Sequence, residues 1–64
     1  MNNLRLWREA NFLNQRQLAK KINAHQSWIS NIERETIKPW PKIMKDLSEA
    51  LGVDEKELFP EEEK

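Results

Sequence analysis

The segment 26–34 contains five polar residues whose side chains are well suited to hydrogen bonding with another molecule. They are Gln26, Ser27, Ser30, Asn31 and Arg34. Gln and Asn can pair with adenine through two hydrogen bonds, Arg with guanine, and Ser with a donor or an acceptor on a base edge. A helix face that only meets water would more often carry Glu and Lys. The set therefore points to contacts with the bases of double-stranded DNA.

These side chains share one face if the segment is helical. Ile29 and Ile32 then point to the core on the opposite face, at the spacing of an amphipathic helix. Trp28 falls at the edge, where packing is favoured over donation of its indole N–H to phosphate. His25 takes the N-cap position, and Ala24 before it turns inward. The spacing predicts a helix whose polar face is free to meet a partner.

Another helix is predicted immediately before this one. Asn14 is its N-cap, Gln17 completes a capping box, and Leu13 can pack onto Leu18 across the helix start. Its buried stripe is Leu18, Ala19 and Ile22. Asn23 ends the helix, because Asn tolerates the left-handed conformation that often follows a last turn. The two helices therefore meet at a sharp corner.

A first helix is predicted over roughly residues 2–11, because Leu4, Trp7 and Arg8 stand three and four residues apart. We expect Trp7 to be buried, and Leu6 and Phe12 are further apolar candidates. A loop over residues 36–41 follows the third helix. Pro41 suits the first turn of a fourth helix, which Gly52 ends. The apolar positions of this helix are Ile43, Met44, Leu47, Ala50 and Leu51.

A short fifth helix is predicted to end near residue 60. Asp54 is its N-cap, Glu57 completes a capping box, and Val53 can pack onto Leu58. The chain has 64 residues and no internal repeat, which predicts one domain over residues 1–60 and a frayed acidic tail over 61–64.

Composition excludes several classes of protein. Cysteine is absent and there is one histidine, so neither a disulfide framework nor an ordinary metal site is expected. The chain lacks a set of nucleophile, base and orienting group, and lacks a glycine-rich phosphate loop, so we expect no enzyme activity and no cofactor. No apolar run approaches the ~20 residues that cross a membrane, and the N-terminus lacks the order of a signal peptide. We expect a cytoplasmic protein.

Charge is divided along the chain. The whole has a formal net charge of zero, but residues 1–40 hold seven basic and three acidic residues, a charge of +4. Residues 41–64 hold four basic and eight acidic residues, a charge of −4. A face built from the first forty residues can meet phosphate, whereas the tail is repelled by it. The alternative is a solvated surface of mixed charge.

The sequence resembles the repressor and Cro family of phage and bacterial regulators over nearly its whole length. The shared positions, in order and spacing, are Leu13, Gln15, Leu18, Ala19, Ile29, Ile32, Glu33, Pro39, Leu47, the run from Ala50 to Val53, Leu58 and Phe59. The four most restrictive places of the motif hold Ala19, Asn23, Ile29 and Ile32. The resemblance implies a compact, five-helix, lambda-repressor-like all-α domain in which helices 2 and 3 form a helix-turn-helix.

The resemblance also implies function. It indicates a bacterial or phage-type transcriptional repressor that places the helix His25–Arg34 in the major groove of a palindromic operator. Gln26, Ser27 and Asn31 would read bases, with Ser30 and Arg34 as further candidates. Contacts to the DNA backbone are implied for Asn14, Gln15, Arg16, Trp28, Lys38, Trp40 and Lys42. Gln15 would also brace Gln26, and Arg8 and Glu33 match a pair that forms an internal salt bridge in relatives.

Four residues depart from the family pattern. Asn23 and Glu35 stand where glycine is common, and Pro41 has no N–H to offer to phosphate. His25 replaces the usual Ser or Thr cap, and a protonated imidazole opposes the positive end of a helix. Protonation of His25 would, as a hypothesis, strengthen phosphate binding below neutral pH.

A single reading helix offers few base contacts, so we expect a weak homodimer on half-sites about one helical turn apart. The contact between copies is expected around residues 51–60, through Leu51, Val53, Leu58, Phe59 and Pro60. No membrane or small-molecule partner is expected. The alternative function is a protein-interaction module, such as an antitoxin-like partner, that keeps the fold and binds little DNA.

Overall fold

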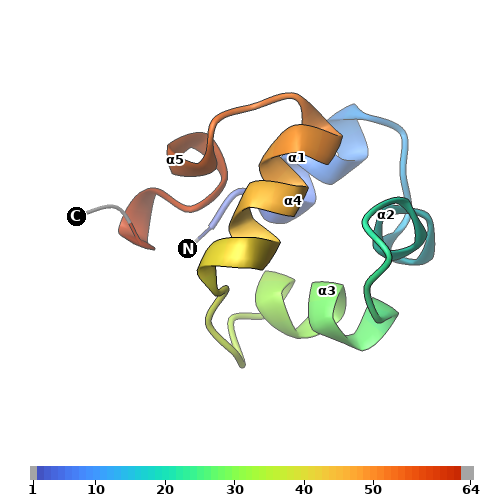
Figure 1. Ribbon diagram of the computed structural model, residues 1–64, viewed down its shortest axis with the longest axis horizontal. Coiled ribbons are helices and arrows are strands. Elements are labelled where there is room, and N and C mark those ends of the chain that lie inside the picture. The colour runs from blue at the N-terminus through green and yellow to red at the C-terminus, as the bar shows by residue number, and fades with distance from the viewer. Residues whose placement is uncertain (1, 63–64) are drawn as a thin grey trace.

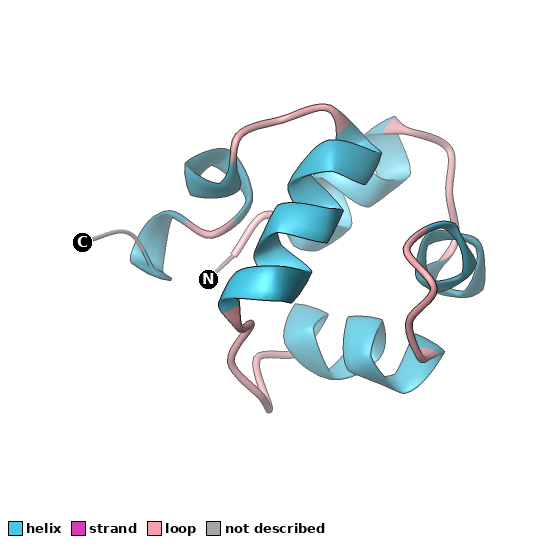
Figure 2. Cartoon of the chain, in the orientation of Figure 1, coloured by secondary structure: helices cyan, strands magenta, loops and turns pink. Residues whose placement is uncertain are grey.

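The computed structural model describes residues 2–62, and in this part of the chain all regular structure is helical. The elements are α1 (Leu4–Ala10), α2 (Gln15–Lys21), α3 (Gln26–Glu33), α4 (Pro41–Leu51), α5 (Glu55–Leu58) and a final 3-10 turn, η1 (Pro60–Glu62). Figure 1 shows α2 and α3 side by side, α4 in the middle of the molecule, and α5 on the side away from α2. Only loops join these helices (Figure 2). The all-α prediction with five helices is confirmed.

The core draws on all five helices. Its buried side chains are Leu4, Leu18, Ala19, Ile29, Ile32, Ile43, Leu47, Leu51, Leu58 and Phe59. Trp7, predicted to be buried, is half-buried and packs against this cluster. Leu6 and Phe12 are 62% and 92% exposed, so their candidacy for the core was wrong. Leu6 is two residues from Leu4 and so lies on another face of α1, and Phe12 comes after α1 has ended.

Four helices end at a residue with left-handed backbone: Phe12 (φ 60°), Asn23 (φ 58°), Glu35 (φ 62°) and Gly52 (φ 72°). The backbone N–H of the residue that follows each of these donates to a carbonyl oxygen in the last turns of the helix, at 2.8–3.2 Å. The donor and acceptor residues are Leu13 and Arg8, Ala24 and Ala19, Thr36 and Asn31, and Val53 and Ser48. This arrangement is the Schellman motif, which usually employs glycine. Asn23 ends α2 as predicted, and Glu35 and Phe12 have the same role without being glycine.

The helix starts differ from one another. At α2 the predicted capping box is confirmed, with Asn14 Oδ1 accepting from Gln17 N at 2.7 Å and Gln17 Oε1 from Asn14 N at 2.8 Å. At α5 the predicted box is absent, because the Glu57 N–H already bonds to the backbone carbonyl of Asp54 at 2.9 Å. Pro41 occupies the first turn of α4, as its missing N–H allows.

The segment before α1 connects α3 to α5. Asn2 Nδ2 donates to the carbonyl of Ile32 at 2.9 Å, and the Asn3 N–H donates to the carbonyl of Leu58 at 2.8 Å. The start of the chain therefore contributes to holding the end of α3 in place. Residues 60–62 form η1, which begins at Pro60, whose ring fixes φ. Residues 63–64 of the predicted acidic tail lie outside the described part, and its fraying stays a prediction.

Candidate nucleic-acid interface

The outward face of α3 carries the five side chains predicted to read bases. Gln26, Ser27 and Arg34 are exposed, and Ser30 and Asn31 are half-buried. On the opposite face Ile29 and Ile32 are fully buried, at 0% exposure. These two anchors fix the rotation of α3 about its axis, so the polar face cannot turn inward without losing the core.

The reading candidates fall into two groups along α3. Gln26 and Ser27 lie in the first turn, and Asn31 and Arg34 lie at the last turn and the C-cap. Gln26 and Arg34 are eight residues apart, which is about 12 Å along a helix. That length spans roughly three to four base-pair steps of B-form DNA, at about 3.4 Å per step.

At the end of α3 the candidate readers are bonded to each other. Arg34 Nη2 donates to Asn31 Oδ1 at 2.7 Å. The Thr36 hydroxyl lies 3.1 Å from Asn31 Oδ1 and 3.2 Å from the Asn31 carbonyl oxygen. The sequence pattern did not single out Thr36, because its place beside Asn31 depends on the turn at Glu35. Asn31 and Arg34 are therefore one bonded unit rather than two independent side chains.

A buried ion pair fastens α3 to α1. Arg8 Nε donates to Glu33 Oε2 at 2.6 Å, Nη2 donates to Glu33 Oε1 at 3.2 Å, and Nη1 donates to the carbonyl of Leu13 at 2.8 Å. Hydrogen bonding to Glu33 raises the pKa of Arg8 above its usual value, against the opposing effect of burial. The two-pronged contact orients both side chains as well as attracting them. It is the pair that the family resemblance implied.

Gln15 extends this network to the start of α2. Its Nε2 donates to Glu33 Oε1 at 3.1 Å, and its side chain is half-buried. The resemblance placed Gln15 against phosphate and against Gln26. In the free protein its amide N–H is bonded to Glu33, so Gln15 ties α2 to α3. All buried side-chain N and O atoms of residues 2–62 have a hydrogen-bond partner.

Three aromatic rings form a row beside the corner. His25 contacts Trp28 edge to face, with 4.8 Å between ring centroids, and Trp28 contacts Trp40 in the same way at 5.3 Å. The His25 side chain makes no capping bond to α3, so its predicted cap exists in backbone position only. Trp28 is 37% exposed. The packing favoured for Trp28 is present, and its remaining exposed part borders the outward face of α3.

The residues predicted to contact the DNA backbone differ in their exposure and in the bonds that their side chains already make. Arg16 and Lys38 are exposed. Asn14 is exposed but has its Oδ1 bonded within the α2 capping box, and Trp40 is half-buried against Trp28. Lys42 Nζ lies 2.9 Å from Asp46 Oδ2, in an ion pair whose lysine remains 81% exposed. Ion pairs with so exposed a lysine contribute little free energy, so Asp46 does not hold Lys42 firmly.

The predicted contact between two copies needs correction. Leu51, Leu58 and Phe59 are 5%, 0% and 2% exposed, because α5 and the end of α4 pack into the core. Their side chains therefore have almost no surface left for a second copy. Of the five residues predicted, Pro60 is exposed and Val53 half-buried.

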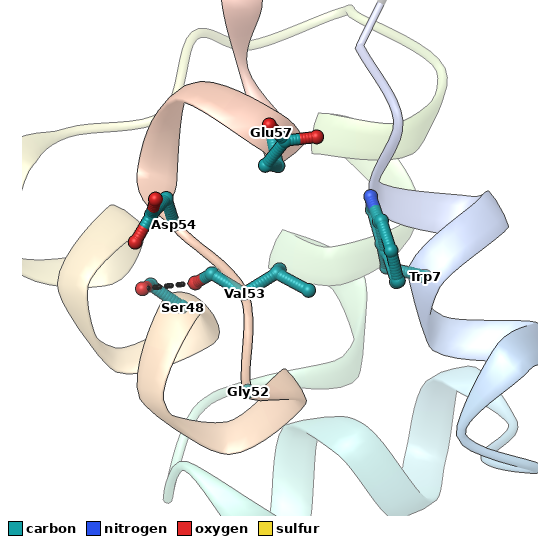
Figure 3. A pocket seen from close by; sticks show the side chains of 6 residues that line it. All are labelled: Trp7, Ser48, Gly52, Val53, Asp54 and Glu57. Atoms are coloured by element: carbon teal, nitrogen blue, oxygen red, sulfur yellow. Dashed lines mark hydrogen bonds between the residues drawn. The ribbon is translucent and has the colours of Figure 1, made fainter.

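Val53 forms one wall of an open hollow of about 410 Å³ between α1 and the α4–α5 connection (Figure 3). The other lining residues are Trp7, Ser48, Gly52, Asp54 and Glu57. The Ser48 hydroxyl donates to the carbonyl oxygen of Val53, which holds the connection in place. None of the lining residues belongs to α2 or α3, so the hollow is separate from the outward face of α3.

Two further properties bear on the site. Within residues 2–62 no three His, Cys, Asp or Glu side chains gather where they could hold a metal ion. None of the helices described is both long and apolar enough to span a bilayer.

Comparison with known proteins identifies the domain. The sequence profile of the helix-turn-helix domain family matches residues 1–63, almost the entire chain. A comparison with curated proteins found no match. The α2–corner–α3 geometry agrees with the family match, because two short helices meet at a tight turn and the second presents a polar face. The chain belongs to the helix-turn-helix domain family, a class of domain that binds DNA and regulates transcription.

Proposed function

We propose that the protein binds double-stranded DNA sequence-specifically as a transcriptional repressor, with α3 in the major groove. The observation that carries this is the orientation of α3. Ile29 and Ile32 are fully buried while Gln26, Ser27 and Arg34 are exposed on the other side. A rigid helix with amide, hydroxyl and guanidinium groups outward matches the donor and acceptor pattern of base edges.

The rigidity of α3 is part of the proposal. Glu33 is bonded to Arg8 on α1 and to Gln15 on α2. At the end of α3, Asn2 bonds to the carbonyl of Ile32. A reading helix held from three sides keeps its side chains at fixed positions, which sequence discrimination requires.

Exposed basic residues would hold the DNA backbone. Arg16 lies at the start of α2, Lys38 in the loop after α3, and Lys42 in the first turn of α4. Each phosphate that a cation neutralises releases counterions and adds affinity without sequence preference. Trp28 and Trp40 complete this set with indole rings next to the outward face of α3.

Two copies would bind a palindromic operator. One α3 covers only a few base pairs, and typical specific affinity requires more. Half-sites one helical turn apart then let a twofold pair of domains bind the same side of the DNA. Repression requires only that this complex occupies a promoter. The surface left for contact between copies includes Pro60 and the half-buried Val53.

Titration with a random-sequence duplex at low salt tests the DNA-binding claim. We expect micromolar binding that weakens steeply as salt rises. Charge reversal of two proposed backbone contacts, Arg16→Glu with Lys38→Glu, should abolish it. The matched control is Arg5→Glu with Lys56→Glu, which reverses the same number of charges at exposed residues of α1 and α5 that make no proposed contact. Absence of binding at micromolar protein would reject the proposal and favour a protein-interaction module.

A further inference from the structure

We infer that Asn31, Arg34 and Thr36 act as one donor-only reading unit that selects guanine at the base pairs under the last turn of α3. This deepens, and rests on, the function proposed above. It assigns Arg34 as the principal reader at this end of α3. Asn31 becomes both a reader and a positioning residue, and Thr36 is a positioning residue that need not touch DNA.

The acceptor of Asn31 is already in use. Its Oδ1 accepts from Arg34 Nη2 at 2.7 Å, a bond strengthened by the charge of the guanidinium. The Thr36 hydroxyl lies within bonding distance of the same atom at 3.1 Å and shares its single proton with the Asn31 carbonyl. These bonds set the orientation of the amide. Oδ1 points toward Arg34, and the two N–H groups of Nδ2 point the other way.

This orientation changes what Asn31 can recognise. Pairing with adenine through two bonds requires Oδ1 to accept from the base while Nδ2 donates to it. Oδ1 is bonded both to Arg34 and to the Thr36 hydroxyl, so its two lone pairs are in use and Asn31 has only donors to offer. Adenine, which presents a donor beside its acceptor in the major groove, is then a poor match.

Guanine is the complementary base for this unit. Its major-groove edge presents two acceptors, N7 and O6, and arginine pairs with both at once. A guanidinium carries five N–H donors, of which the bond to Asn31 uses one. That bond also holds the side chain of Arg34 over the outward face of α3, which lowers the entropy that binding must remove. Arg34 and the amide of Asn31 together present donors only.

The backbone explains why Thr36 reaches Asn31. Glu35 has φ 62°, and this left-handed turn lets the Thr36 N–H bond to the Asn31 carbonyl at 3.0 Å. The Thr36 hydroxyl is thereby brought over the same residue. A helix that continued past residue 34 would carry Thr36 away from Asn31, since residues five apart do not share a helix face.

Selection of bound sequences from a random duplex pool, done in parallel with variants, tests the inference. Wild type should enrich guanine at one or two positions of each half-site. Arg34→Ala removes the guanidinium, and should reduce that guanine preference by at least about tenfold. Thr36→Val removes the hydroxyl and should admit adenine at a neighbouring position, while Thr36→Ser should restore the wild-type preference. Arg5→Ala is the matched control and should change nothing.

A second measurement needs no DNA. In the free protein, the side-chain amide resonances of Asn31 should shift in Arg34→Lys and in Thr36→Val, and stay near wild type in Thr36→Ser and Arg5→Lys. Unmoved Asn31 resonances in Arg34→Lys and Thr36→Val would overturn the inference, whatever the DNA result. Sequence-specific binding with adenine under Asn31, or with a guanine preference that survives Arg34→Ala, would overturn it and leave the proposed function standing. No binding to any duplex would overturn both.

Discussion

Arg8 and Glu33, on α1 and α3, form a two-pronged ion pair with Nε–Oε2 and Nη2–Oε1 distances of 2.6 and 3.2 Å. The two side chains are only 10% and 6% exposed. Solvent has little access to either side chain, and the pair fastens the proposed reading helix to the first helix. We therefore expect both the stability of the domain and the position of the outward face of α3 to depend on it.

Removal of one partner should be strongly destabilising. Arg8→Ala or Glu33→Ala leaves the other charge buried and uncompensated, which typically costs about 3–5 kcal/mol in the free energy of unfolding. Urea denaturation followed by circular dichroism measures this cost. Arg5→Ala is the matched control, because the Arg5–Glu9 pair is 75% and 56% exposed and such pairs contribute at most about 1 kcal/mol.

The pH dependence of this stabilisation has a definite sign. The pKa of Arg8 is raised in the folded state, so its contribution is complete below the unfolded pKa and is lost only as pH rises through the higher folded value. The destabilisation by Arg8→Ala should accordingly be the same at pH 7 and pH 9. A cost no larger than that of Arg5→Ala would contradict the role assigned to the pair.

The helix ends yield a prediction of increased stability. Phe12 has a left-handed backbone at φ 60°, and the residue is 92% exposed. Burial of its ring therefore contributes little free energy to offset the backbone strain. That conformation costs a non-glycine residue roughly 1–2 kcal/mol. Phe12→Gly should raise the free energy of unfolding by about 0.5–1 kcal/mol, because relief of this strain outweighs the entropy that glycine gains in the unfolded chain. Thermal denaturation measures it.

The reverse change is the control for this prediction. Gly52 has φ 72°, and no atom lies within 4 Å of the place that a Cβ would occupy, so Gly52→Ala tests backbone strain without a clash. It should lower stability by about 1 kcal/mol or more. If Phe12→Gly destabilised the domain, the exposed ring would have a role that these contacts do not explain.

Local signals predicted much of the fold. Asn14 and Gln17 formed the capping box that their spacing indicated, because such a box depends only on residues three apart. Asn23 ended α2 for the same local reason. The helix ends at Glu35 and Phe12 were harder to predict, because neither residue type favours the left-handed backbone conformation. There the fold imposes the turn: Leu13 and Ile37, just after these ends, pack against the core.

The candidate site was predictable in its parts and less so in its bonding. The periodicity of Ile29 and Ile32 placed the polar residues of α3 outward. Three features depended on contacts that the spacing does not show: the bond from Gln15 to Glu33, the place of Thr36 beside Asn31, and the burial of Phe59. The sequence shows that Phe59 is apolar, but only the packing of α5 determines whether its side chain is exposed to a second copy or buried in the core.

Gln26 should read one base pair. It is exposed in the first turn of α3, where recognition helices commonly meet base edges. Gln26→Ala should cost about 1–3 kcal/mol of binding free energy on the preferred site and relax preference at a single position. Affinities for duplexes that differ at each position measure both effects. Retention of the full wild-type preference would remove Gln26 from the reading set.

Lys38 should act on the phosphate backbone alone. It is exposed in the loop that follows α3. Lys38→Ala should weaken binding to all sequences alike and lower the slope of log affinity against log salt by about one. The matched control is Lys56→Ala, an exposed lysine on α5, away from the proposed interface (Figure 1). A loss confined to one sequence would assign Lys38 to base reading instead.

Enrichment from a random duplex pool is the decisive measurement for DNA reading by α3, because binding, sequence preference and pairing of copies are read together. We predict a palindrome whose half-sites lie about one helical turn, roughly ten base pairs, apart. The Arg16→Glu, Lys38→Glu variant should enrich nothing. A pool that remains random after repeated rounds at low salt would contradict the proposal that α3 reads DNA.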